Sequence, residues 1–158
     1  MIKLYNRFRY KIMIAVYMIL AAILIPNFIP NTNINPELQS YYEDYMGIVN
    51  QYCTKDQYNQ PVRLDIDFEN LPDPEIGHCE IRINSYYIKL DRSYWLESNE
   101  DARRQLMFHE LSHCIIDKDH VNDVSNYMFF MTQPLEPTTV RRQVTDDIKD
   151  HCEFREVH

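Results

Sequence analysis

The residues His109-Glu110-Leu111-Ser112-His113 form an HExxH pattern, and this pattern offers the clearest chemistry in the chain. Four residues make about one turn of a helix, so both imidazoles would project from the same face and could bind one metal ion. Glu110 would reach the same cleft without binding the metal. We therefore expect Zn²⁺ at this site and Glu110 as the general base that takes a proton from a zinc-bound water.

A catalytic zinc site needs a third protein ligand and keeps a fourth position open for water. His120 lies seven residues beyond His113, past the expected end of the helix near Asp117, and a turn there would bring its ring back to the metal. Asp119 remains an alternative third ligand, because carboxylates also bind zinc. We prefer His120.

The HExxH pattern must be held by a helix, and the sequence predicts one from Asn99 to about Lys118. No glycine or proline interrupts this stretch, and Ser98 precedes Asp101 by three residues, as in a capping box. Beyond Asp117 no period holds until a closing helix behind Pro137, where apolar residues recur every four positions. Those residues are Val140, Val144, Ile148 and Cys152.

Upstream of this helix the sequence predicts one helix and three strands. Asn35 would cap a helix over residues 36–53. Alternating apolar residues predict a strand over Val62–Phe68, and residues 69–79 read as a loop. Two further alternating runs on either side of Asn84 predict a hairpin. The order of elements indicates an α+β domain.

The N-terminus has the composition of a membrane segment. Four basic residues precede Ile12–Ile25, which is almost wholly apolar, and the first carboxylate of the chain is Glu37. We expect residues 1–25 to be a transmembrane anchor or a signal segment, residues 26–36 a linker, and residues 37–158 the metallopeptidase-like domain. The domain would lie outside the cytosol, membrane-anchored, or secreted if the segment is cleaved.

Charge and cysteine content fit this location. Beyond the four N-terminal basic residues, 12 Lys and Arg stand against 24 Asp and Glu, so nucleic acid is excluded as a partner. An even set of four cysteines predicts two disulfides in an oxidising compartment, with three possible pairings that the sequence does not distinguish. Four free buried thiols are the alternative. The cysteines are Cys53, Cys79, Cys114 and Cys152.

The segment HELSHCIIDKDH, followed by DVSNYM, resembles the metzincin clan of zinc endopeptidases, in particular small exported metallopeptidases with an HELGHC…H motif. The resemblance implies a small mixed sheet, an active-site helix, and a turn in which Met128 supports the metal site without binding the ion. It also implies that the strand Tyr86–Leu90 forms a sheet edge that pairs with the substrate. Metzincins have a glycine where this chain has Ile116, so the helix should run one or two residues longer here. A longer helix favours His120 as the third ligand, whereas Asp119 has the spacing that is usual in metzincins.

These observations predict a monomeric zinc endopeptidase that acts on a peptide or protein substrate. Two other interpretations stay open. One is a catalytically silent zinc-binding module, whose metal stabilises the fold. The other is a membrane-tethered interaction module without metal, held together by disulfides alone. The sequence does not specify the substrate.

Overall fold

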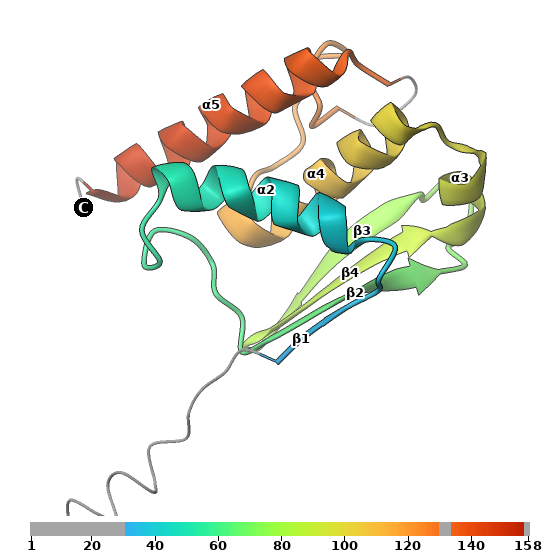
Figure 1. Ribbon diagram of the computed structural model, residues 1–158, viewed down its shortest axis with the longest axis horizontal. Coiled ribbons are helices and arrows are strands. Elements are labelled where there is room, and N and C mark those ends of the chain that lie inside the picture. Colours follow the sequence, from blue (N-terminus) through green and yellow to red (C-terminus); the bar gives the residue numbers. More distant parts are fainter. Residues whose placement is uncertain (1–30, 130–133, 157–158) are drawn as a thin grey trace, which may run out of the picture.

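A four-stranded mixed sheet forms one layer of the protein. The computed structural model describes residues 31–129 and 134–156 (Figure 1). The strands are β1 (Asn31–Ile34), β2 (Arg63–Glu69), β3 (Gly77–Arg82) and β4 (Ser85–Asp91), and they lie in the order β1-β2-β4-β3. β1 and β4 are both parallel to β2, and β3 is antiparallel to β4. β3 is therefore an edge strand.

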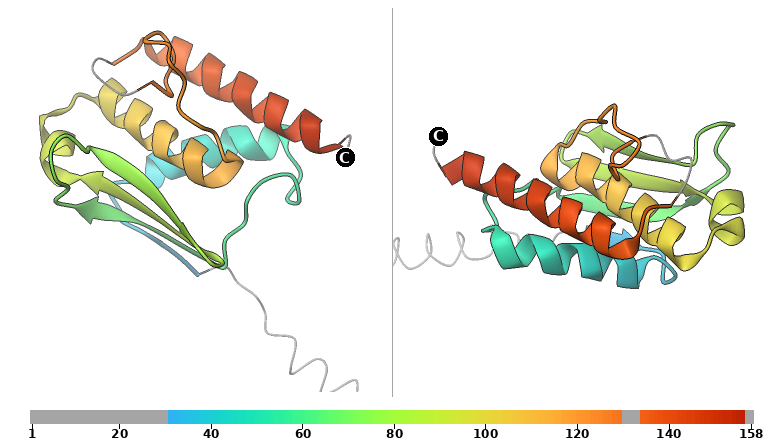
Figure 2. Two further views of the ribbon diagram at one scale, coloured as in Figure 1. Left: turned by 180° about the vertical axis from the view of Figure 1, so that it is seen from behind. Right: turned by 90° about the horizontal axis from the view of Figure 1, so that it is seen from above.

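Helices cover one face of this sheet and form the second layer (Figure 2). They are α2 (Gln39–Tyr52), the short α3 (Arg92–Glu97), α4 (Glu100–Ile116) and α5 (Pro137–Glu156). α4 packs on β3 and β4 and also contacts α2 and α5. It thus lies between the sheet and the other two long helices, and most of its residues are buried on that account.

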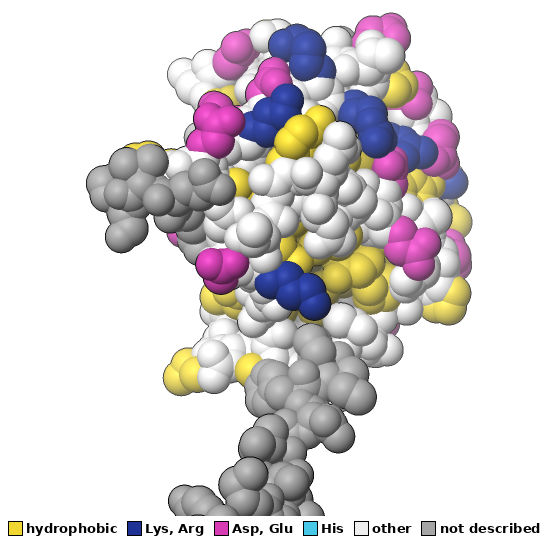
Figure 3. Space-filling view, turned by 60° about the vertical axis from the view of Figure 1, so that its left-hand side comes forward, with side chains coloured by type: hydrophobic (Ala, Val, Ile, Leu, Met, Phe, Trp, Pro, Cys, Tyr) yellow, Lys and Arg dark blue, Asp and Glu magenta, His cyan; other side chains and the backbone are white. Residues whose placement is uncertain are grey.

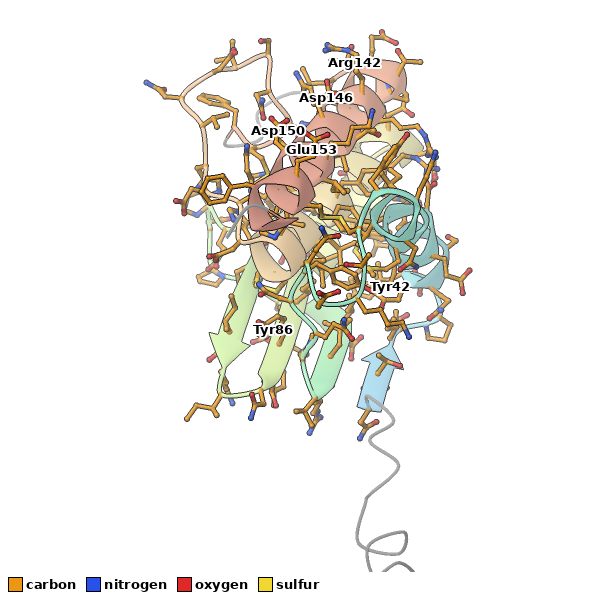
Figure 4. The ribbon with its side chains drawn as sticks, turned by 90° about the vertical axis from the view of Figure 1, so that its left-hand side faces the viewer. Tyr42, Tyr86, Arg142, Asp146, Asp150 and Glu153 are labelled. Atoms are coloured by element: carbon orange, nitrogen blue, oxygen red, sulfur yellow. A yellow bond between two sulfur atoms is a disulfide. The ribbon has the colours of Figure 1, made fainter. Side chains whose placement is uncertain are left out.

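The hydrophobic pattern explains the layers. Leu64 and Ile66 of β2 are buried against the helices, with Ile88 and Leu90 of β4 beside them. The apolar residues of α5 face inward at four-residue spacing, whereas its charged residues line the outer face (Figure 4). Each large apolar side chain buried in this way contributes roughly 1.5–3 kcal/mol to folding. The charged outer residues are Arg142, Asp146, Asp150 and Glu153.

The structure confirms an α+β fold with a small mixed sheet. The helix that carries the HExxH residues, the strand at 63–69, the hairpin and the closing helix all form near their predicted positions. The short helix α3 was not predicted. Its N-terminus is capped by Asp91, whose carboxylate accepts a hydrogen bond from the Tyr94 amide.

The interpretation of residues 26–36 as a linker is wrong for the described part of that segment. Residues 31–34 form β1, and the Asn31 amide donates to the carbonyl of Val62 next to the start of β2. Asn33 also donates from its side chain to the Asp65 carboxylate. The folded domain therefore includes residue 31, and its sheet has four strands where the sequence predicted three.

Three element boundaries also differ from prediction. α2 begins at Gln39, because Asn35 caps a preceding turn, in which its side chain accepts from the Glu37 amide. Asn99, and not Ser98, caps α4 by accepting from the Ala102 amide. The loop predicted to reach residue 79 ends earlier, because β3 already starts at Gly77.

Two disulfides are present, and all four cysteines take part in them. Cys53 at the end of α2 is bonded to Cys152 of α5, and Cys79 of β3 is bonded to Cys114 of α4. The alternative of four free thiols is wrong. One disulfide fastens the outer helices together, and the other fastens the edge strand to the central helix.

Across the described ranges 31–129 and 134–156, no helix has the length and apolar character needed to cross a membrane. The apolar segment Ile12–Ile25 lies outside the described residues, as do residues 26–30 of the predicted linker.

Candidate metal centre and cleft

Three imidazoles converge at the C-terminal end of α4. The Nε2 atoms of His109 and His120 are 2.9 Å apart, and each is 3.1 Å from the Nε2 atom of His113. The three residues form a group whose geometry could hold a metal ion. His109 is buried, His113 is half-buried and His120 is exposed, so the group lies at the surface end of a cleft.

The chain turn that brings His120 back follows directly from the end of the helix. α4 ends at Ile116, and Asp117 adopts the left-handed conformation with φ 54°. The amides of Asp117 and Lys118 both donate to the carbonyl of Ser112, which closes the helix. An aspartate thus makes the reversal that a glycine would make more easily, because short polar side chains tolerate this conformation.

The structure separates the two candidates for the third position. His120 belongs to the group, whereas Asp119 lines the cleft without joining it. The helix extends through Ile116, the position at which a glycine was expected, and the left-handed residue that reverses the chain is Asp117, one position later. Placing the third ligand one residue later compensates for this extension.

Backbone carbonyls fix the tautomer of the two helix histidines. The Nδ1–H of His109 donates to the carbonyl of Tyr127 at 2.9 Å, and the Nδ1–H of His113 donates to that of Lys118 at 2.6 Å. A carbonyl oxygen can only accept, so Nδ1 must carry the proton in both rings. In the neutral rings both Nε2 atoms then present bare lone pairs to each other.

Electrostatics keep these rings neutral. Burial lowers the pKa of His109 to about 4, and burial also lowers the pKa of His113. Lone pairs that face one another across 3.1 Å repel unless a cation lies between them. The arrangement therefore favours a bound cation, and neutral imidazole is the form that binds metals.

The three Nε2 atoms are close enough together to bind one metal ion. His109, His113 and His120 would hold the ion, since zinc–imidazole distances are usually about 2.0 Å and the Nε2 atoms are 2.9 to 3.1 Å apart. An ideal tetrahedral site would place the nitrogens about 3.3 Å apart, so the triangle needs to open by only a few tenths of an ångström. Three imidazoles also suit copper, iron and nickel, so the donor set alone does not identify the metal.

Glu110 is the buried acidic group of this centre. Its side chain is only 4% exposed and lines the same cleft as the three histidines. Among the described residues no donor forms a hydrogen bond with its carboxylate, and burial, together with the nearby Glu75, raises its pKa to about 8. Burial makes the charged form of a carboxyl group costly, and groups with a pKa shifted in this way are concentrated at functional sites.

Gly77 makes room for this carboxyl group. A Cβ atom at position 77 would lie 2.8 Å from Oε1 of Glu110 and 3.1 Å from both Cγ of Glu110 and Cδ1 of Leu106. Sequence reasoning missed this residue because it assigned Gly77 to a loop. An isolated glycine in a strand indicates a close approach of another group.

The cleft has a volume of about 720 Å³ and lies between β3 and the C-terminal half of α4. Residues 74–79 and Ile81 line one wall, and the other wall consists of Leu106, His109, Glu110 and His113 of α4 and of residues 117–120 in the turn after it. The expectation that Tyr86–Leu90 forms the sheet edge is wrong, because β4 lies between β2 and β3. The free edge beside the cleft belongs to β3.

A buried polar network supports the centre from behind. Ser112, the fourth residue of the HExxH pattern, donates to the carbonyl of Phe108, and its hydroxyl meets those of Tyr45 and Tyr127 at 3.1 and 3.0 Å. Because the Tyr127 carbonyl also orients His109, one tyrosine links the network to the metal centre. Sequence reasoning missed this link, because it joins side chains from distant parts of the chain.

The segment predicted to form a methionine-containing turn does turn. The amide of Phe129 donates to the Asn126 carbonyl, and the amide of Met128 donates to the Asn126 side chain. Met128 is fully buried, and its carbonyl accepts from the amide of Val121, the residue after His120. The turn is thereby hydrogen-bonded to the segment that carries His120.

Comparisons of this chain with protein-family models, with curated proteins and with solved structures found no match.

Proposed function

We propose that this protein is a zinc-dependent endopeptidase of the HExxH type. One observation carries the proposal: the lone pairs of three imidazoles converge in a cleft that also contains the buried carboxyl group of Glu110. Three protein ligands leave one position of a tetrahedral ion open, which distinguishes a catalytic zinc site from a structural one.

Each residue has a defined role in this proposal. His109, His113 and His120 hold the ion, and Met128 lies in the turn that supports them. A bound zinc ion supplies Lewis-acid chemistry, since it lowers the pKa of water and polarises a carbonyl group. Glu110 accepts a proton from water as general base and returns it to the leaving amine. A nearby cation favours the charged carboxylate, so metal binding would bring Glu110 into its basic form.

The edge strand β3 supports a polypeptide substrate. Its outer edge borders the cleft, and an extended peptide can add to such an edge through main-chain hydrogen bonds. Pairing through the main chain can bind an internal segment of a substrate polypeptide, and this suits an endopeptidase. The apolar side chains of Ile76, Ile81 and Leu106 in the cleft walls would receive apolar side chains of the substrate.

An exported, membrane-anchored location is part of the proposal. Both disulfides support it, because such bonds persist in oxidising compartments and are rare in the cytosol. The basic residues before Ile12–Ile25 support the orientation, with the domain outside the cytosol. We propose that the protein is a monomer. Its partners would be the membrane, which this segment contacts, and a peptide substrate.

A purely structural zinc site is the second interpretation, and it lacks support in the described residues. Structural zinc sites are closed by four protein ligands, whereas the group found in ranges 31–129 and 134–156 contains three. The cysteines that could close such a site are held in disulfides.

Substitution of Glu110→Gln tests the proposal, with Glu97→Gln as the matched control. Glu97 is an exposed residue of α3, so the same chemical change there should leave the site intact. We expect one zinc ion per chain in all three proteins, and casein hydrolysis that is lost in Glu110→Gln and in the presence of a chelator. Hydrolysis that persists in Glu110→Gln, or zinc-loaded wild type without hydrolysis of any peptide in a mixed library, would contradict it.

A further inference from the structure

One end of the sheet brings the start of the described chain and the β3–β4 turn together. The strand register places Asn31, Arg63, Ser85 and Arg82 in one row across the four strands. The Arg63 amide donates to the carbonyl of Asn84, within that turn. Figures 1 and 4 show the first strand beginning at the same end at which β3 and β4 are joined.

The turn at this end exposes a large apolar side chain. Ile83, between β3 and β4, is 94% exposed, although turn positions usually carry polar residues or glycine. Ile81, in β3 just before this turn, is half exposed. Figure 3 shows hydrophobic side chains at the end of the domain where the described chain begins. Ile83 contributes little to the core, so the fold itself does not explain an isoleucine there.

Basic and aromatic side chains surround the same end. The guanidinium groups of Arg63 and Arg82 lie over the ring of Tyr87, at 5.6 and 4.8 Å from its centroid. Both arginines are also paired within the protein, Arg63 with Asp65 and Arg82 with Glu80. Tyrosine and arginine are residues that membrane proteins place at the level of the lipid headgroups.

The length of chain before Asn31 decides what this end faces. Five residues, 26–30, separate the apolar run Ile12–Ile25 from Asn31, and Phe28 and Ile29 are among them. Five residues span at most about 17 Å, and crossing from β1 to β3 takes about 14 Å at the usual strand spacing. If the apolar run enters a bilayer, this end of the sheet must lie at its surface, whereas α3 lies at the opposite end.

We propose that the β3–β4 turn, residues 82–84, is a membrane-contact site whose Ile83 side chain enters the lipid interface. Ile81, two residues away, lines the cleft, so this contact holds one end of the cleft beside the bilayer. The substrates would then be peptide segments close to the membrane surface. The contact itself depends on the proposed N-terminal anchor and not on zinc chemistry, whereas this choice of substrate rests on the proposed function.

Tryptophan fluorescence of the full chain in phosphatidylcholine vesicles tests the contact. The native chain has one tryptophan, Trp95, which is 2% exposed and serves as background. We compare Ile83→Trp with Leu96→Trp, since Leu96 is 62% exposed on α3 at the opposite end. In vesicles whose acyl chains are brominated near the headgroup, the fluorescence contributed by the new tryptophan at position 83 should fall at least twofold. The fluorescence contributed by the new tryptophan at position 96 should stay unchanged.

Three results would overturn the contact site. The first is equal quenching at both positions, and the second is no quenching at position 83 in chains that float with the vesicles. The third is a mature chain whose mass shows that the N-terminal segment has been removed. Zinc content and casein hydrolysis of the same samples report separately on the proposed function. Quenching at position 83 in a chain without zinc would leave the membrane contact standing and remove the peptidase.

Discussion

Gly77→Ala is the substitution whose effect the structure defines most closely. The new Cβ atom would stand 2.8 Å from Oε1 of Glu110, where an unstrained contact needs about 3.4 Å, so the carboxyl group must move by roughly 0.6 Å. Gly77 does not have a positive φ, so alanine is compatible with the backbone. Any loss must therefore come from the contact with Glu110 and Leu106.

A shift of this size has a calculable cost. Misplacing a catalytic group by 1 Å can cost about a hundredfold in rate, so we expect kcat for peptide hydrolysis to fall about tenfold, or about 1.4 kcal/mol in activation free energy. Overpacking should lower the free energy of unfolding by about 1–3 kcal/mol. Zinc content should stay at the wild-type level, because the three histidines lie outside the contact.

Gly47→Ala is the matched control, because Gly47 and Gly77 are the only glycines in the chain. Gly47 lies inside α2, and nothing is within 4 Å of a Cβ atom there. Alanine should stabilise that helix by about 0.5–1 kcal/mol and leave hydrolysis unchanged. Urea unfolding and steady-state hydrolysis measure both variants. A Gly77→Ala protein with wild-type kcat and stability would refute the assigned packing of Glu110.

Three further perturbations give distinct expected results. Replacing Cys79 and Cys114 together by serine should cost about 4 kcal/mol of stability in a urea melt and weaken zinc retention against a chelator, because this disulfide joins the two walls of the cleft. Ser112→Ala should lower the free energy of unfolding by about 1–3 kcal/mol, because two buried tyrosine hydroxyls lose a shared partner; unchanged stability would contradict the network. Burial raises the pKa of Glu110 from 4.5 to about 8, so in metal-free protein its contribution to stability is present below pH 4.5 and is lost as the pH rises towards 8. Relative to Glu110→Gln, metal-free wild type should therefore lose roughly 2 kcal/mol between pH 5 and pH 7 in urea unfolding, and a constant difference would contradict the burial.

The local part of the site could be predicted from the sequence. The HExxH spacing defines one helical face, and an uninterrupted stretch around it defines the helix that carries it. The position of His120 also depended on local information, since it required only that the helix end near Asp117, where the left-handed residue is found. These features depend on residues within about 20 positions of one another.

The nonlocal part could not be predicted. Asn31–Ile34 is a polar segment without alternation, and it becomes a strand only because β2 offers a free edge. Strand order is likewise a property of the assembled sheet, so the edge beside the cleft was assigned to the wrong strand of the hairpin. The disulfide pairing and the link from Ser112 to Tyr127 depend on how α4 packs against distant elements.

X-ray absorption at the zinc edge of the purified, zinc-loaded chain reports on the three-histidine site itself. We expect one zinc ion with three imidazole nitrogens at about 2.0 Å and one further light atom, and a loss of zinc in His120→Ala but not in Asp119→Asn. A spectrum with sulfur ligands, a fourth imidazole, or substoichiometric zinc that His120→Ala leaves unchanged would contradict the proposed site.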